Sequence, residues 1–501
     1  MTKCLLNLGV LVLLAGNPAA APDRRLLDAS RHQDREAAFA LMKQNVDVNV
    51  AQADGATALH WAAHWDDLPL ADALLRAGAS VDAANDLGLT PLALACSNGG
   101  GAMVQRLLQS GADPNAAPLQ EPVLMTAARV GNTEAVRALV ARGARVNATG
   151  SSRGQTALMW AVANRHPDVA RILIENGADV RARSRTEDVV VQRGSRYGGV
   201  VSQQRAVTER SVATTPQGGS TPLLFAARSG DAASARLLIA AGADVNETAP
   251  DGTSVLVMAS HSGHSPLVVS LLELGANPDA AGSGYTALHA AVLRGDLNMV
   301  TQLISHGAHV NVLVTKGTSS RRYSTDLALN AAWVGATPFW LAARFAEPEI
   351  MRVLAAHGAD PLVTSKDETT PLIAVLAAGV NWGSSASDSR DRRLDPEDLA
   401  RRAIERDSIE KRVLQVAALA VGLGADVNAR NYVGDTALHQ AATKGFNRVI
   451  QLLADKGAHL DARNKRGQTP LSIAEAGSKN NGDGSPSLQS TAELLRTLGA
   501  T

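Results

Sequence analysis

A short pattern of polar and apolar positions recurs along almost the whole chain. Each copy begins with a hydroxyl residue, continues into an apolar stretch built around leucine and usually closes with alanine, as in Thr57–Ala62 (TALHWA) and Thr90–Ala95 (TPLALA). The hydroxyl group can accept the free N–H groups of a helix start, and proline suits the first turn. Each copy therefore predicts a short helix whose leucine points into a core. Further copies begin at Thr156, Thr221, Ser254, Thr286, Thr337, Thr370, Thr436 and Thr469, with a degenerate one at Pro122.

A second phrase follows each copy about twenty residues later. It reads Gly-Ala-Asp, then an apolar residue or proline, then Asn, as at Gly111–Asn115, Gly242–Asn246 and Gly424–Asn428. Glycine ends a second helix where a left-handed residue is needed, and Asp and Asn shape the turn that follows. Both phrases repeat in phase about every 33 residues. Helices of about two turns are marginal alone in water, so stacking must bury their apolar faces.

The two phrases together closely resemble the ankyrin repeat, with its T-P-L-H-x-A and G-A-D-V-N motifs. The resemblance covers roughly residues 24 to 501, apart from three insertions. It implies an all-α solenoid of about 12 helix–turn–helix units with β-turn fingers, including degenerate caps at Leu26–Asn49 and Ala492–Gly499. It also implies a curved array whose fingers and first helices line the concave face, and a role in binding other proteins.

Three insertions interrupt the period, at about 184–219, 313–335 and 381–412. We interpret the first as an extended finger of the β-hairpin kind and the second as another finger extension. The third falls between the two helices of one repeat. It predicts an additional polar helix, with Asp395 as its cap and Pro396 in its first turn. All three are also compatible with tolerated surface loops, although long insertions in compact proteins are often functional.

The N-terminal segment predicts export. Lys3 precedes the apolar stretch 4–16, and small residues follow at Ala19–Ala21. This arrangement is typical of a signal peptide over residues 1–21, which leaves a mature array at 22–501. The apolar stretch is short for a membrane span, but an uncleaved N-terminal anchor is the alternative. We expect a periplasmic or secreted protein, and the prevalence of arginine over lysine suggests a bacterial source.

Composition and motifs exclude several function classes. The 48 basic and 48 acidic residues balance, which argues against a general nucleic-acid binder. The sequence contains no zinc-protease or phosphate-loop motif and no G-x-S-x-G motif in the strand–turn–helix context of a nucleophile elbow, and its two cysteines form no metal-spaced pair. His60 and His64 have metal-compatible spacing, as do His261 and His264, but they fit ordinary repeat positions. His60, His289 and His439 are expected to brace the turn. We predict no enzyme activity, no metal and no cofactor.

The candidate binding surface follows from the repeat register. The two residues after the alanine pair of each first helix should face the concave groove, where basic and aromatic residues are frequent and acids are absent. Arginine and aromatic residues are typical of binding hot spots. Trp61 and Trp160 occupy a more inward position and are expected in the core. The candidate residues are His64, Trp65, Arg129, Arg228, His261, Arg294, Arg344, Phe345 and Lys444.

The sequence therefore predicts a non-enzymatic scaffold that binds a polypeptide partner, of acidic character, on its concave face. We expect a monomer with no nucleic-acid partner and no membrane span once the signal peptide is removed. A cell-wall component or small anion is an alternative ligand. A secreted effector or toxin-like protein, with activity carried by the insertions, is the alternative function.

Overall fold

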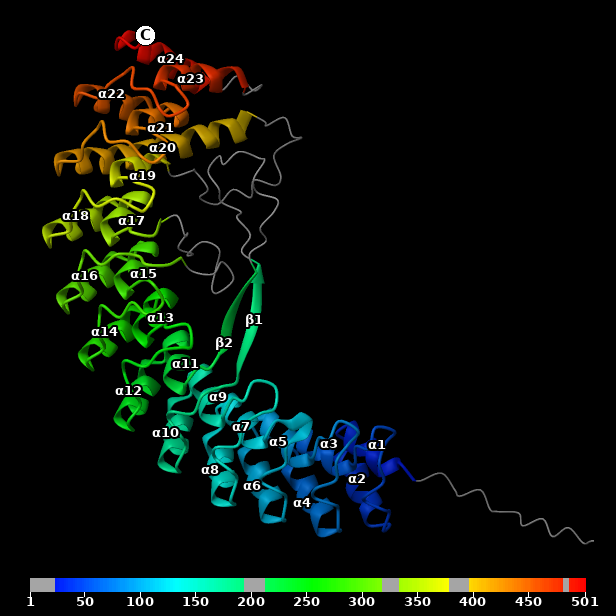
Figure 1. The fold of residues 1–501 in the computed structure, drawn as a ribbon. Helices are drawn as coiled ribbons and strands as arrows, with labels where there is room; N and C mark the ends of the chain where they lie inside the picture. Colours follow the sequence, from blue (N-terminus) through cyan, green and yellow to red (C-terminus); the bar gives the residue numbers. More distant parts are fainter. Residues whose placement is uncertain (1–22, 193–211, 318–332, 378–395, 481–485) are drawn as a thin grey trace, which may run out of the picture. The chain divides into compact units, whose positions relative to one another are not determined.

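The computed structural model describes residues 23–192, 212–317, 333–377, 396–480 and 486–501 (Figure 1). The predicted signal peptide, the arginines at 193, 196, 205 and 210 of the first insertion and Asp395 lie outside these residues. So do Arg321, Arg322 and Tyr323 of the second insertion. No helix among the described residues is both long and apolar enough to cross a membrane.

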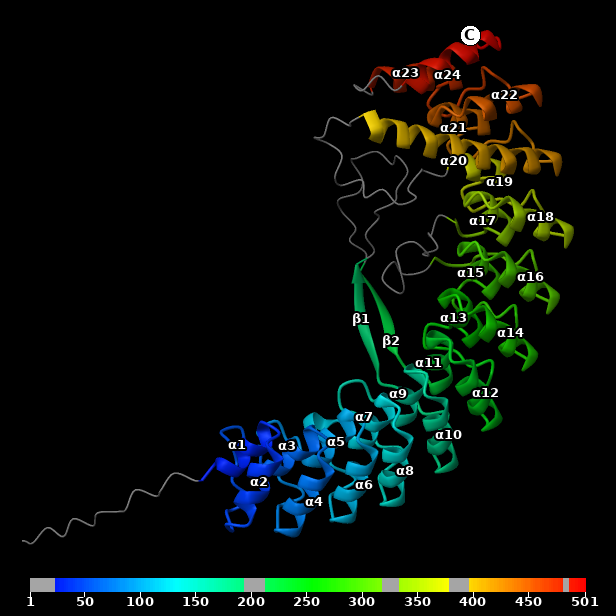
Figure 2. The ribbon, with the colours of Figure 1, turned by 180° about the vertical axis from the view of Figure 1, so that it is seen from behind.

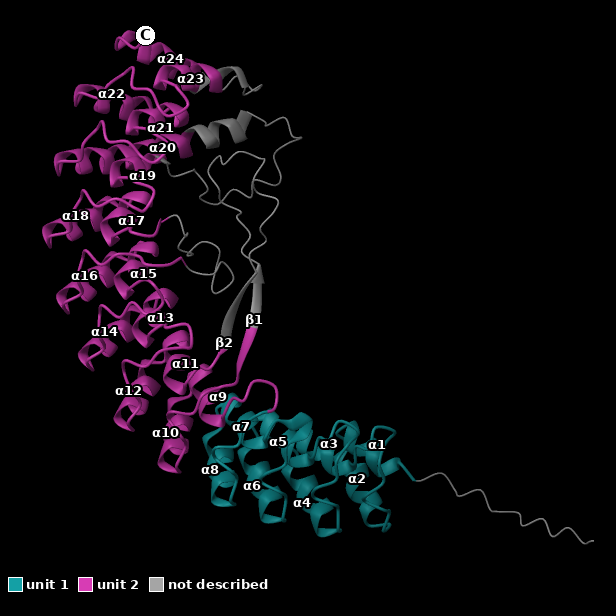
Figure 3. Ribbon diagram, viewed as in Figure 1, with its two compact units in different colours: residues 1–150 teal, residues 151–501 magenta. Residues whose placement is uncertain are grey.

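The chain divides into two compact units, residues 1–150 and 151–501, which Figure 3 distinguishes by colour. In the first unit, helices pair in chain order and alternate between a first-helix layer and a second-helix layer. The first helices are α1 (Arg25–Arg31), α3 (Ala58–His64), α5 (Pro91–Asn98) and α7 (Val123–Val130). The second helices are α2 (Arg35–Met42), α4 (Leu68–Arg76), α6 (Gly101–Gln109) and α8 (Thr133–Ala141), and a short 3-10 turn, η1, spans Pro118–Gln120.

The second unit continues the same alternation. Its first helices are α9 (Ala157–Ala163), α11 (Pro222–Ser229), α13 (Val255–Ser262), α15 (Ala287–Leu293), α17 (Pro338–Arg344), α19 (Pro371–Ala377), α21 (Ala437–Lys444) and α23 (Pro470–Asn480). Its second helices are α10 (Pro167–Glu175), α12 (Ala232–Ala240), α14 (Ser265–Glu273), α16 (Leu297–Ser305), α18 (Pro348–Ala356), α20 (Pro396–Gly422), α22 (Asn447–Asp455) and α24 (Pro486–Thr497). Within this unit each first helix packs on the next first helix, as Figures 1 and 2 show from opposite sides. The expected all-α repeat architecture is confirmed.

The first helices begin as the sequence predicts. Thr90 is an extended N-cap whose Oγ1 accepts a hydrogen bond from the Ala93 amide at 3.3 Å. Thr286 does the same for α15, and its backbone N–H donates to His289 Nδ1 at 3.2 Å in a reciprocal capping arrangement. Each satisfied N–H removes one orphan donor from a helix too short to form alone.

Glycine ends many of the helices for conformational reasons. Gly263 caps α13 with φ +81°, and Gly242, which follows α12, has φ +97°. Both lie in the left-handed region, which residues with a Cβ rarely adopt.

The second helices use acidic or amide caps that the sequence interpretation did not identify. The Asp67 carboxylate accepts from the Leu70 amide at 3.1 Å, and Asn132 and Asp296 cap α8 and α16 in the same way. The negative charges of Asp67 and Asp296 also interact favourably with the partial positive charge at a helix start. The turn between the paired helices is therefore encoded as specifically as the first helix itself.

Leucines of the recurring phrase form the core, as predicted. Leu59, Leu92 and Leu158 are essentially inaccessible to solvent, and the small residues Ala62 and Ala95 beside them are also buried. Methyl side chains let neighbouring first helices approach closely, which produces a continuous core along each unit.

The asparagine of the second phrase joins neighbouring repeats. Its side-chain oxygen accepts a backbone amide of the following repeat, and its amide group donates to that repeat's glycine carbonyl. In Asn246 these bonds reach the Asn277 amide at 2.8 Å and the Gly275 oxygen at 3.3 Å. Asn115, Asn311 and Asn428 make equivalent pairs. The residue therefore does more than shape its own turn, because it fixes the spacing between repeats.

The first insertion contains a two-stranded antiparallel sheet. Strands β1 (Thr186–Gln192) and β2 (Val212–Gly218) pair with Thr186 opposite Gly218 and Gln192 opposite Val212. These strands fit the expectation of an extended finger of the β-hairpin kind.

The third insertion ends in a helix, α20, that begins at Pro396, as the sequence predicts. This helix continues for 27 residues to Gly422 and includes the second helix of the repeat. The two are continuous because no glycine or proline interrupts residues 397–421. At the C-terminal end, α23 ends at Asn480 and α24 begins at Pro486, and residues 481–485 lie outside the described part.

Candidate interaction surface

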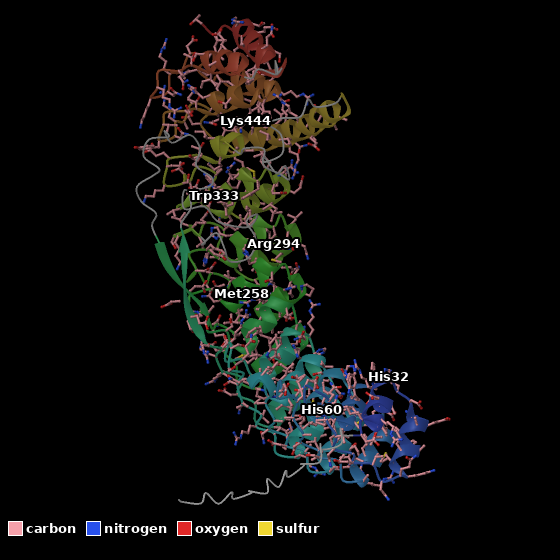
Figure 4. The ribbon with its side chains drawn as sticks, turned by 90° about the vertical axis from the view of Figure 1, so that its right-hand side faces the viewer. His32, His60, Met258, Arg294, Trp333 and Lys444 are labelled. Atoms are coloured by element: carbon pink, nitrogen blue, oxygen red, sulfur yellow. The ribbon has the colours of Figure 1, made fainter. Side chains whose placement is uncertain are left out.

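The predicted surface residues all lie at the C-terminal ends of first helices, as the repeat register requires. We call this set the helix-end row. In the first unit it contains His64, Trp65 and Arg129, and in the second unit it contains Arg228, His261, Arg294, Arg344, Phe345 and Lys444. Figure 4 labels Arg294 and Lys444 at different levels of the second unit, together with Trp333.

An aromatic cluster surrounds the end of α3. The rings of Trp61 and Trp65 stack with centroids 6.3 Å apart, and His64 meets Trp65 edge-on at 4.5 Å. Trp65 remains 42% exposed and donates from its indole nitrogen to the Arg31 carbonyl at 3.2 Å. Trp61 is half-buried under the Arg31 guanidinium, 5.6 Å from the ring centroid, so it belongs to this surface cluster as well as to the helix packing. Trp160 is also only half-buried.

Arg129 makes a long ion pair within the first unit. Its Nη2 lies 3.7 Å from Glu121 Oε1, and both side chains are substantially exposed. An exposed pair of this kind contributes about 1 kcal/mol or less to stability, so it restrains the guanidinium only weakly.

Arg228 keeps its guanidinium on the surface. It lies 5.8 Å from the Phe225 ring centroid, and the Arg228 backbone carbonyl accepts a hydrogen bond from His264 Nε2 at 3.0 Å. The side chain is therefore positioned by its own helix, while its backbone is held by the next repeat.

His261 does not belong to the exposed surface. Only 5% of it is accessible, and burial lowers its pKa to about 4, with a smaller contribution from the neighbouring Arg294 charge. Its ring packs against Tyr285, with centroids 6.4 Å apart. The surface assignment of His261 was wrong because a short imidazole at this position fits beneath the side chains of the following repeat.

Arg294 is exposed, but its side chain also makes a hydrogen bond within the repeat array. Its Nη1 donates to the His261 carbonyl at 3.0 Å, and its guanidinium passes close to Gly263. A hydrogen bond to the helix end of the previous repeat also occurs at Asn98, which donates to the His64 carbonyl at 2.5 Å. In the row itself, Trp65 and Arg294 each donate to a carbonyl of the previous repeat while part of the side chain remains at the surface.

Arg344 and Phe345 share a cluster with Trp333. The Arg344 guanidinium lies 5.7 Å from the Trp333 ring centroid, and Phe345 meets the same ring edge-on at 5.7 Å. Burial lowers the pKa of Arg344, although arginine remains protonated at physiological pH. All three side chains are half-buried. Trp333 belongs to the second insertion, and the order of residues gave no signal that it would pack beside Arg344.

Lys444 lies at the corresponding end of α21. It is half-buried, and its pKa is lowered by burial and by the positive charge of Arg344. Its carbonyl accepts a hydrogen bond from Arg406 Nη2 at 2.9 Å, and the Gly445 carbonyl accepts from the same nitrogen at 3.0 Å. Arg406, on α20, is a residue of the third insertion that connects this insertion to the row.

The histidines of the recurring phrase brace the turn, as expected. The Thr57 amide donates to His60 Nδ1 at 3.1 Å, while His60 Nε2 donates to the Leu89 carbonyl of the next repeat at 3.0 Å. Burial lowers the pKa of His60, so the neutral ring with one donor and one acceptor is favoured. Trp340 replaces histidine in α17, and its indole N–H makes the equivalent bond to the Thr369 carbonyl at 2.8 Å.

Within the described residues, no group of three or more histidine, cysteine or acidic side chains is placed to hold a metal ion. Cys96 is fully buried, and burial raises the pKa of its thiol to about 12. That thiol is therefore poorly suited to act as a nucleophile. The pKa changes of Cys96 and of the bracing histidines arise from burial within the repeat packing.

Curated relatives share the repeat region with this chain. An E3 ubiquitin-protein ligase, KEG, of Arabidopsis thaliana is 29% identical over 300 residues, which are 55% of this chain and 18% of the relative. The human Ankyrin repeat and SOCS box protein 16 is 28% identical over 230 residues, 44% of this chain and 47% of the relative. The probable E3 ubiquitin-protein ligase XBOS33 of rice is 34% identical over 172 residues, 31% of this chain and 32% of the relative. The chain thus spans less than half the length of each of these three proteins.

A family model described as ankyrin repeats, in three copies, matches residues 26–118, 117–184, 223–314 and 409–481. These ranges include more than half of the chain and coincide with paired helices in both units. The chain belongs to the ankyrin-repeat family.

Proposed function

We propose that the protein is a binding scaffold that holds a polypeptide partner on the helix-end row of its second unit. Ankyrin repeats generally serve in protein–protein interaction, and that general role is supported by the family match. To this role we add the surface that is used and the kind of partner that it takes.

The composition of the row carries this proposal. Its exposed or half-buried members in the second unit are Arg228, Arg294, Arg344, Phe345 and Lys444, with no acid among them. Arginine and aromatic side chains supply large contact areas and directional hydrogen bonds, which makes them frequent at binding hot spots. Their positions on rigid first helices of one repeat array mean that binding requires little additional ordering, because the backbone is already fixed by the repeats.

The proposed partner is an extended or helical polypeptide of acidic character. Complementary charge would speed its association and fix its orientation, while the aromatic side chains would contribute most of the apolar contact. We further propose that binding takes place outside the cytoplasm, in the periplasm or after secretion, on the basis of the apolar segment at 4–16.

Affinity capture with three forms of the chain tests this function. The first is the parent, the second carries Arg228→Glu and Arg344→Glu, and the third carries Arg236→Glu and Arg352→Glu on second helices of the same repeats. Arg236 and Arg352 lie on α12 and α18, so the control changes net charge equally but on the opposite layer. We expect a partner from an extract of the source organism to be retained by the parent and the control but not by the row variant. Equal retention by all three would contradict the proposed surface.

A further inference from the structure

The exposed apolar side chains of the first unit gather on one face. Among its described residues, four large apolar side chains are exposed: Trp65 at 42%, Leu87 at 58%, Leu119 at 70% and Val130 at 40%. Trp65 and Val130 lie at the ends of first helices, and both leucines lie in fingers, the segments that lead from a second helix to the next first helix. None of the four lies on a second helix, and Figure 1 shows the second helices along the opposite side of this unit. The fingers of the first unit are residues 44–57, 77–90 and 110–122.

Each first helix of this unit runs from a finger to the helix-end row, and contacts connect the two. The indole nitrogen of Trp61 donates to Gln52 Oε1, in the finger before α3, at 3.4 Å. The Trp61 ring stacks in turn on Trp65 at the helix end. On α7, Glu121 of the preceding finger reaches Arg129 at 3.7 Å. Fingers and helix ends are therefore the two edges of one face.

The finger edge of this face is acidic. The Asp86 amide donates to the Asp54 carbonyl at 2.8 Å, and a Cβ built at Gly88 would lie 3.9 Å from the Pro118 Cα, so consecutive fingers touch. The three fingers contain no lysine or arginine. Each carries an acidic residue between its turn and the next first helix: Asp54, Asp86 and Glu121.

The helix ends also touch one another. Asn98 Nδ2, at the end of α5, donates to the His64 carbonyl at 2.5 Å. A Cβ built at Gly99 would lie 3.5 Å from Val130 Cγ1. Because His64 is followed by Trp65, the exposed apolar side chains of this edge belong to one continuous surface that crosses three repeats.

Positive charge is concentrated at this helix-end edge. Arg31 ends α1 and Arg129 lies in the last turn of α7, and both residues are exposed. Asp66 is an acid close to this edge, but its carboxylate approaches Gly100, at the start of the second helix α6. The face therefore has an apolar middle between an acidic edge and a basic edge.

The backbone at Leu119 supports a role in contact. Leu119 and Gln120 have φ values of +51° and +63°, in the left-handed region that few residues other than glycine and asparagine adopt. The Leu119 side chain is nevertheless 70% exposed. A leucine here neither suits the backbone nor fills the core, so contact with a partner explains it better than folding stability does.

The spacing of the first helices indicates which conformation the partner has. The helices α3, α5 and α7 pack consecutively, and packed helices lie about 8–10 Å apart. Seven residues of an α-helix rise about 10 Å and return to the same side of it. A β-strand covers that distance in about three residues, which places the two side chains on opposite sides. A helix can therefore present one apolar side to successive repeats, whereas a strand cannot.

We propose that this face of the first unit binds an amphipathic helix of a partner protein, with basic residues along one flank of the helix and acidic residues along the other. Its apolar residues recur with a period of about seven and contact Trp65, Leu119 and Val130. Its basic flank faces Asp54 and Asp86, because opposite charges fix the orientation of a partner. This inference rests on the proposed scaffold function but concerns a surface other than the row of the second unit.

Synthetic peptides of about three heptads test the proposal. The mixed-flank peptide has leucine at the first and fourth positions of each heptad, lysine on one flank and glutamate on the other. Two peptides with the same leucines carry only lysine or only glutamate on both flanks. A fourth, the proline peptide, is the mixed-flank peptide with proline at its centre, which breaks the helix. Binding of fluorescein-labelled peptides to the full chain is measured by fluorescence anisotropy in low salt, and circular dichroism records helix formation.

Matched variants of the full chain locate the site. Leu87→Ser and Leu119→Asn each remove one apolar side chain from the proposed face. Leu274→Ser and Leu297→Asn are the controls, since these leucines of the second unit are 40% and 39% exposed on the second-helix layer. Asparagine tolerates the left-handed conformation, so the melting temperature of Leu119→Asn should not fall.

We expect the mixed-flank peptide to bind the parent about tenfold more tightly than the other three peptides and to gain helix on binding. Leu87→Ser and Leu119→Asn should each weaken binding by about threefold to tenfold, whereas the controls should bind like the parent. Equally tight binding of the proline peptide would mean that the face takes an extended chain and would overturn the proposal. Equal binding to the parent and both site variants, or no binding of the mixed-flank peptide, would overturn it too, and equal affinity for the three charge patterns would refute the assigned flanks.

These outcomes are separable from those for the scaffold function. The affinity capture depends on Arg228 and Arg344 of the second unit, which the peptide experiment leaves unchanged. If the peptide fails while capture is lost in the row variant, only the first-unit site is wrong. If the peptide binds as expected while all three forms of the chain retain the captured partner equally, the proposed surface of the second unit is wrong.

Discussion

Acid should destabilise the array, and His289 offers a direct measure of the effect. This residue is inaccessible to solvent, and burial lowers the pKa of its ring from 6.5 to about 4. Backbone groups at Ala336 and Val312 act in the opposite direction but do not outweigh burial. The ring accepts the Thr286 amide on Nδ1, which requires that nitrogen to be unprotonated.

The sign of the pH effect follows from the lowered pKa. Below pH 6.5 the unfolded chain binds a proton at this histidine, whereas the folded chain does not until the pH approaches 4. The unfolded state is therefore favoured increasingly as the pH falls through this window, and the stability contribution is fully present only above pH 6.5. Each unit of pKa difference is equivalent to about 1.4 kcal/mol. Burial of His289 should therefore lower the free energy of unfolding, relative to neutral pH, by about 2 kcal/mol at pH 5 and by about 3 kcal/mol below pH 4.

The variant His289→Gln removes this titration. Glutamine can still accept the Thr286 amide through its side-chain oxygen, but it binds no proton in this pH range. We expect the variant to be less stable than the parent at pH 7.5, because its shape differs, and to lose about 2 kcal/mol less than the parent between pH 7.5 and pH 5. His357→Gln serves as the control, since His357 is exposed at the end of α18.

Because repeat arrays can unfold in parts, the assay combines urea denaturation with hydrogen exchange. Far-UV circular dichroism reports the whole chain, and exchange of peptides covering α15 and α16, corrected for the intrinsic pH dependence of amide exchange, reports the local effect. If His289→Gln loses as much stability between pH 7.5 and pH 5 as the parent does, the assigned role of burial at His289 is refuted.

Three other perturbations test the packing. Asn246→Ala removes two inter-repeat hydrogen bonds and should lower the free energy of unfolding by about 1–3 kcal/mol in urea denaturation, whereas Asn176→Ala, which removes a bond within one helix end, should cost less. Gly263→Ala should lower the melting temperature, because alanine rarely adopts the left-handed backbone conformation of this position and its Cβ would meet the Arg294 guanidinium. A melting temperature equal to that of the parent would contradict this packing. Cys96 should resist a water-soluble thiol reagent until urea unfolds the chain, and rapid labelling under native conditions would show that α5 opens more readily than its burial implies.

Much of the fold could be predicted because the repeat couples local and long-range signals. Thr90, Leu92 and Gly111 each report one physical requirement, a cap, a core contact and a left-handed residue, and each recurs in phase. Their combination identifies the family without any long-range calculation. The caps at Asp67 and Asp296 could have been predicted equally well, because each is an acidic residue directly before a second helix and can accept a hydrogen bond from a free amide of that helix.

The candidate surface was predicted less completely. Register alone places Arg228 and His261 at equivalent positions, but one is exposed and the other is buried. The difference depends on side-chain length and on Tyr285 and Arg294 from the next repeat, which no local pattern specifies. The meeting of Trp333 with Arg344 likewise depends on how the second insertion returns to the array. Local periodicity thus predicts which residues reach a surface position more reliably than it predicts what lies beside them.

Site-specific photo-cross-linking tests the proposed binding surface most directly, because it reports contact rather than loss of affinity. A photoreactive phenylalanine analogue would replace Phe345 on the helix-end row or Arg352 on the second helix of the same repeat, and each form would be illuminated with the captured partner. We predict a cross-linked product from position 345 and none from position 352. Cross-linking from position 352, with none from position 345, would place the partner on the second-helix layer and contradict the proposed surface.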